Sequence, residues 1–158
     1  MILSNSRRIC ILTLVCCVCI TAAPLYAQHQ EDILDSIRQS YIVANVPDST
    51  HFDSYLKRDL EDYFTSTGIG KPSVKWELLR KGATQSGVAY PKFYVWAWVY
   101  RSDSLFTQGA IRLAAVETTH FEVTQFVTQE EIRKDTSKIF SIFPSAVCAI
   151  ILERFMQR

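Results

Sequence analysis

The chain has 158 residues and a formal net charge of +1 at pH 7, and 48% of its residues are hydrophobic. This length fits one domain, and the near-neutral charge excludes the strongly basic surface typical of nucleic-acid binding. The sequence contains no glycine-rich phosphate loop, no HExxH zinc motif and no GxSxG nucleophile motif. We therefore predict no catalytic residue, no metal site and no cofactor.

Residues 1–27 have the layout of a secretory signal peptide. Arg7 and Arg8 form a basic start, residues 9–23 are almost wholly apolar, and Ala27 is a small residue suited to cleavage. A membrane anchor needs about 20 apolar residues, and this run is shorter. We expect a cleaved leader and export to the periplasm or the cell exterior of a bacterial envelope, with membrane contact only during export.

Residues 28–158 then form a single α+β domain without disulfides. Four of the five cysteines lie in the leader, which leaves Cys148 within the apolar run SAVCAIILERF. A domain of this size can bury a sufficient core without cross-links, and we expect Cys148 to be a buried structural thiol. The alternatives to cleavage are an uncleaved anchor and a lipidated cysteine within the leader.

Two amphipathic helices are predicted at the start of the domain. The first covers residues 31–44 and stops before Pro47. Thr50, with Asp53 three residues later, resembles a capping box at the start of the second helix, which ends near Gly68. The two apolar stripes are Ile33, Ile37, Tyr41 and Ala44, and then Phe52, Tyr55, Leu56, Leu60, Tyr63 and Phe64.

The hydrophobic repeat then changes from the helical period to alternation, which predicts strands. Four strands are expected, at residues 74–78, about 88–101, 105–117 and 121–127, with short connections between the later three. Short connections indicate antiparallel neighbours, so the strands form a meander.

Helices return after the last strand. Thr128 and Glu131 form a capping box that begins a short helix, and Pro144 suits the first turn of the final one. We predict a two-layer α+β domain in which the C-terminal helices pack on one sheet face. The architecture is similar to cystatin-like and nuclear-transport-factor-2-like folds, an analogy that assigns no family and no function.

The second strand contains KFYVWAWVY, which separates by parity into two strips. One strip is Phe93, Val95, Ala97 and Val99, and the other is Tyr94, Trp96, Trp98 and Tyr100. A three-residue loop at 102–104 would pair the first strip with Leu113, Ile111 and Gly109 and would place the aromatic strip beside Arg112. A two- or four-residue loop would shift the pairing by one and make the aromatic strip plain core. The sequence leaves both registers open.

The predicted ligand-binding residues are Tyr94, Trp96, Trp98, Arg112 and His120. Aromatic walls with a few polar groups are typical of binding clefts, while buried Trp and Tyr side chains are equally typical of ordinary cores. His51 is interpreted as a solvated neighbour of the second helix start.

We interpret the chain as a non-catalytic module that binds a small molecule or a protein through this sheet face. One alternative is a small enzyme with a pocket between sheet and helices, in which His120 and Arg112 take polar roles. Another is a self-associating protein that forms a homodimer through its aromatic strip.

Overall fold

The computed structural model describes residues 31–86 and 89–156, and its contacts divide the chain into two compact units, 1–39 and 40–158. The predicted leader lies outside the described residues. The described part of the first unit is helical, and the second unit contains the sheet and the remaining helices. Within the described ranges, no helix has both the length and the apolar character required to cross a membrane.

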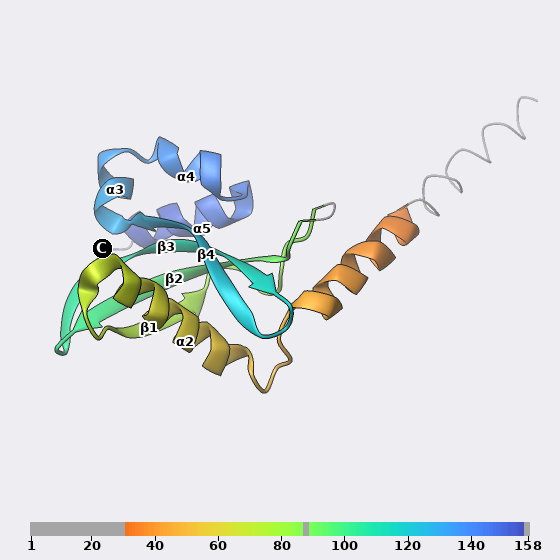
Figure 1. Ribbon diagram of the computed structural model, residues 1–158. Coiled ribbons are helices and arrows are strands. Elements are labelled where there is room, and N and C mark those ends of the chain that lie inside the picture. The colour runs from red at the N-terminus through yellow and green to blue at the C-terminus, as the bar shows by residue number, and fades with distance from the viewer. Residues whose placement is uncertain (1–30, 87–88, 157–158) are drawn as a thin grey trace, which may run out of the picture. The chain divides into compact units, whose positions relative to one another are not determined.

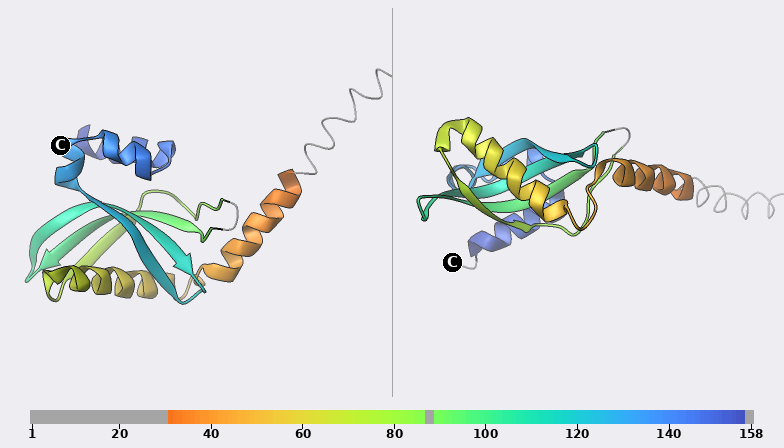
Figure 2. Two further views of the ribbon diagram at one scale, coloured as in Figure 1. Left: turned by 45° about the horizontal axis from the view of Figure 1, so that its top comes forward. Right: turned by 60° about the horizontal axis from the view of Figure 1, so that its bottom comes forward.

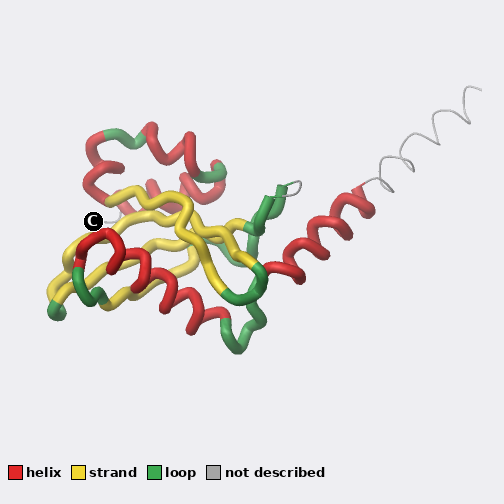
Figure 3. The backbone as a smooth tube through the Cα atoms, viewed as in Figure 1, coloured by secondary structure: helices red, strands yellow, loops and turns green. Residues whose placement is uncertain are grey.

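The described chain is an α+β protein with the predicted order of elements (Figures 1 and 3). Its four strands form one antiparallel sheet in the order β1-β2-β3-β4, which confirms the meander. The elements are a helix over residues 31–45, α2 (Phe52–Phe64), the π-helical turn η1 (Thr65–Ile69), β1 (Ser73–Leu78), β2 (Lys92–Arg101), β3 (Ser104–Val116), β4 (His120–Thr128), α3 (Gln129–Lys134), α4 (Ser137–Ile142) and α5 (Ser145–Met156).

Helices cover both faces of this sheet. The cluster on one face joins α2 to the strip of Phe93, Val95, Ala97 and Val99. The cluster on the other face joins α3, α4 and α5 to Tyr94 and Trp96. Figure 2 shows the two helical layers on opposite sides of the curved sheet. The C-terminal helices do share one sheet face, as predicted, but the expectation of two layers is wrong.

The composition of β2 explains why helices cover both faces of the sheet, which gives three layers in place of the predicted two. Neither parity strip of β2 is polar enough to face water, since one is aliphatic apart from a single ring and the other consists of large rings. Leaving either strip exposed would forgo roughly 1.5–3 kcal/mol for each large side chain. A central strand with two apolar faces therefore requires a cover on each side.

The β2–β3 register combines the two predicted alternatives. A two-residue turn, Ser102 and Asp103, joins the strands, and both residues have positive φ angles of 48° and 65°. A bulge between Val99 and Tyr100 then shifts the pairing by one residue. Beyond it, Phe93 lies opposite Leu113 and Tyr94 lies opposite Arg112, as the three-residue loop predicted. The bulge thus restores the parity that the short turn would have reversed.

The C-terminal helices begin as the sequence indicated. Thr128 accepts a hydrogen bond from the Glu131 amide, and Glu131 accepts one from the Thr128 amide, so the capping box is present. Cys148 is buried, and burial raises the pKa of its thiol. A further short helix, α4, separates α3 from α5 and had no distinct signal in the sequence.

Candidate functional site

Two of the five predicted ligand residues lie inside the core beneath the C-terminal helices. Tyr94 is 5% exposed and Trp96 is 3% exposed. Their rings make edge contacts with Phe143 and Phe155, at centroid distances of 6.1 Å in both cases. The Tyr94 hydroxyl is 2.8 Å from Thr84 Oγ1, which gives this buried polar atom its partner. Both residues therefore fit the alternative in which the aromatic strip is part of the core.

Trp98 lies at the margin of the same cluster and is half-buried. The Arg154 guanidinium lies 5.7 Å from its ring centroid and forms a 2.7 Å ion pair with Glu77. The exposed side of the aromatic strip is thus covered by an arginine of α5, in a cation–π arrangement.

Arg112 and His120 occupy different surroundings. Arg112 is half-buried, and its Nε donates to Thr124 Oγ1 at 3.1 Å while Nη1 donates to the Ile142 carbonyl at 3.1 Å. It therefore ties the sheet to the end of α4. His120 is exposed at the first position of β4, where Nδ1 is 3.3 Å from Thr119 Oγ1. The fold brings Tyr94 and Arg112 together as cross-strand partners and leaves His120 apart from them.

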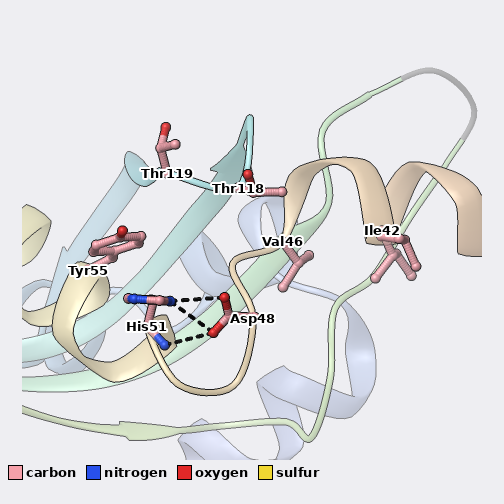
Figure 4. Close-up of a pocket in the computed structure, with 8 residues that line it drawn as sticks. Ile42, Val46, Asp48, His51, Tyr55, Thr118 and Thr119 are labelled. Atoms are coloured by element: carbon pink, nitrogen blue, oxygen red, sulfur yellow. Dashed lines mark hydrogen bonds and ion pairs between the residues drawn. The ribbon is translucent and has the colours of Figure 1, made fainter.

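A different surface has the shape of a binding site. It is an open groove of about 650 Å³ between the end of the first helix, the start of α2 and the β3–β4 turn (Figure 4). We call it the α2 groove. Its lining is mostly apolar with one hydrogen-bonded Asp–His pair, and consists of Ile42, Val43, Val46, Asp48, His51, Tyr55, Thr118 and Thr119.

Asp48 and His51 form the polar centre of the α2 groove. The Asp48 carboxylate accepts from the Thr50 and His51 amides, at 2.9 and 3.1 Å, in the turn that leads into α2. The predicted Thr50–Asp53 box is wrong, because the N-cap of α2 is His51 and it has no side-chain capping hydrogen bond. His51 Nδ1 lies 3.0 and 2.9 Å from the two carboxylate oxygens. The side-chain hydrogen bond from His51 is the main cause that lowers the pKa of Asp48.

This pairing fixes the chemistry of the histidine ring. A charged carboxylate makes Nδ1 the protonated nitrogen, so we assign Nε2 as the acceptor in the neutral ring. The ring also stacks on Tyr55, with 5.3 Å between centroids and an interplanar angle of 21°. Nε2 is the ring nitrogen that does not face Asp48 (Figure 4).

Side chains of α2 hold the opposite wall of the α2 groove in place. The Arg58 guanidinium lies 4.6 Å from the Tyr55 ring centroid and donates to the Thr119 carbonyl at 2.8 Å. Asp59 accepts from the Phe121 amide at 2.6 Å. These contacts attach the β3–β4 turn to α2 and position Thr118 and Thr119.

Asn45 supports the same turn from the first helix. Its side-chain oxygen accepts from the Glu117 amide at 3.3 Å, and its backbone carbonyl accepts from the Thr118 amide at 2.9 Å. Glu117 and Thr118 have positive φ angles of 50° and 57°, a conformation that costs non-glycine residues free energy. Hydrogen bonds to Asn45 therefore hold the turn in a shape that its sequence does not favour.

The α2 groove was not predicted from the sequence, because its walls come from residues about 70 positions apart. The one local signal was the spacing of Asp48 and His51, which fits a carboxylate reaching the amides of a helix start. Among the described residues, no group of three or more His, Cys, Asp or Glu side chains could hold a metal ion. No family model, curated protein or solved structure matches this chain.

Proposed function

We propose that the chain is an exported, non-catalytic module that binds a small molecule or a protein segment in the α2 groove. The observation that carries the proposal is the combination of apolar walls with one oriented polar pair, Asp48 and His51. Binding sites typically have this composition, in which the apolar surface supplies affinity and a few polar groups supply orientation.

The predicted aromatic sheet face is a weaker basis for binding. Tyr94 and Trp96 would have to leave a packed core to reach a ligand, which would expose apolar area on both sides of the interface. The α2 groove needs no such opening, because Val43 is 67% exposed and the His51 side chain is 53% exposed.

The geometry of the α2 groove favours ligands with an apolar body and one hydrogen-bond donor. Val46 and Tyr55 offer apolar contact, and His51 Nε2 offers the acceptor. Phenol and anisole form a matched pair of probes, since they differ in the presence of the hydroxyl donor.

We expect phenol to bind the wild-type protein about fivefold more tightly than anisole, the effect of one net hydrogen bond. Titrations followed by amide NMR shifts should perturb Val46, His51, Tyr55 and Thr118. The variant His51→Phe keeps a ring beside Tyr55 but lacks Nε2, so its preference for phenol should disappear while anisole binding persists.

Phe140→Ala serves as the control, because Phe140 is 60% exposed on α4 and is absent from the α2 groove. It should leave both affinities unchanged. Shifts that cluster around the exposed pair Leu105 and Phe106, or a phenol preference that survives in His51→Phe, would contradict the assignment.

A further inference from the structure

Two cations lie close together on the sheet face that also carries the C-terminal helices. Lys92 is the first residue of β2 and pairs with Ala114, and Arg112 pairs with Tyr94. Residues two apart on a strand share a face, so Lys92, Tyr94, Arg112 and Ala114 point the same way. Lys92 and Arg112 are diagonal neighbours, a relation that places Cβ atoms about 7 Å apart.

Neither cation has a carboxylate ion pair among the described residues, whose pairs all involve other side chains. Both are nevertheless half-buried. Burying a charge without a counter-charge is costly, and two like charges side by side add to that cost. Desolvation, followed by the nearby Arg112, lowers the pKa of Lys92, while Glu122 acts in the opposite sense.

The surroundings leave donors free on the side chain of Arg112. It uses Nε on Thr124 and Nη1 on the Ile142 carbonyl, and a guanidinium has five N–H donors in total. Ala114 lies directly opposite Lys92 on this face and is buried. Glu122 pairs with Ala114 from β4 and is exposed, so it lies at the outer edge.

We propose that Lys92 and Arg112 form a binding site for an oxyanion, the phosphate or carboxylate group of a ligand. A lysine point charge beside a planar guanidinium is a common way to hold such a group. The site shares no residue with the α2 groove and does not depend on the function proposed for it.

Inorganic phosphate and succinate are the probes, and each is titrated into the purified protein at constant ionic strength against sodium chloride. The readouts are the backbone amides of Lys92 and Ala114 and the side-chain Cε signal of Lys92. At least one probe should shift these signals saturably and raise the pKa of Lys92. The probe that binds identifies the chemistry as phosphate or carboxylate.

Two substitutions separate an anion site from a structural cluster. Lys92→Gln should weaken binding about tenfold, since it removes a charge-assisted contact. Glu122→Gln should tighten binding about threefold, because it removes the repulsion between this carboxylate and the bound anion. Exposed charge pairs contribute free energies of this size. Lys134→Gln, which removes an equal charge from an exposed position on α3, should change affinity by less than about twofold.

The proposal is overturned if neither probe binds, if chloride reproduces the shifts, or if Lys92→Gln binds as the wild type does. Circular dichroism of each variant checks that the fold is retained, and Glu122→Gln provides a gain of affinity that misfolding could not produce.

Discussion

At the scale of single residues, the α2 groove depends on how Asp48 is used. The same carboxylate accepts from two amides of the turn before α2 and pairs with Nδ1 of the His51 ring. One side chain thus connects the start of a helix to the polar centre of the candidate site. Substituting it would alter both stability and ligand orientation.

The pKa of Asp48 offers a direct test of this pairing. It is lowered mainly by the His51 side chain, so the carboxylate stabilises the fold at pH values above its unfolded pKa. That contribution is lost as the pH falls through the lower, folded pKa.

We expect a carboxyl-carbon NMR titration to show Asp48 titrating below an ordinary aspartate in the wild type and closer to it in His51→Phe. Asp135, whose pKa is lowered by Ser137, provides an internal control that should not move. Equal Asp48 midpoints in both proteins would show that the ring is not paired as described.

At the scale of elements, the β2–β3 hairpin shows how local strain and register are coupled. Ser102 and Asp103 both adopt left-handed backbone conformations, which two-residue hairpin turns require and which Asn-Gly satisfies more easily. The bulge beside Val99 then corrects the register.

Replacing Ser102 and Asp103 by Asn and Gly should therefore raise the free energy of unfolding by about 1 kcal/mol, since it relieves left-handed strain. Urea denaturation measures the change. An unchanged or lower midpoint would indicate a turn of another geometry.

Gly109 lies where the backbones of β3 and β4 come close together. A Cβ there would overlap the Val127 carbonyl oxygen and come within 2.8 Å of Thr128 Cα, and both are backbone atoms that cannot turn aside. Gly109→Ala should lower the free energy of unfolding by about 3 kcal/mol.

Gly82→Ala is the matched control for Gly109→Ala. Gly82 has a positive φ of 74°, but no atom lies within 4 Å of the place that a Cβ would occupy, so this variant should lose only about 1 kcal/mol. Similar losses for both variants in urea would mean that strand approach is not what requires glycine at 109.

At the scale of the whole molecule, the sequence was informative wherever neighbours along the chain decide the structure. The helix stripes, the change to alternation and the Thr128–Glu131 box all follow from local patterns, whereas the pairing of Phe93 with Leu113 depends on a bulge that the sequence did not predict. They predicted the α+β class and the antiparallel meander.

What the sequence did not predict depends on contacts between distant segments. Tyr94 and Trp96 carry polar atoms and could equally face a ligand or a helix, and only the position of α5 decides between them. The α2 groove likewise forms where residues around His51 come close to Thr118, and no local sequence pattern predicts that they come together.

We propose that the α2 groove is the ligand-binding surface of this protein and that His51 Nε2 is its hydrogen-bond acceptor. A crystal structure of the protein soaked with phenol tests it most directly. We expect phenol to lie between Val46 and Tyr55, with its hydroxyl within hydrogen-bond distance of His51 Nε2. Phenol bound instead among the rings of Trp96 and Trp98, with the α2 groove empty, would contradict it.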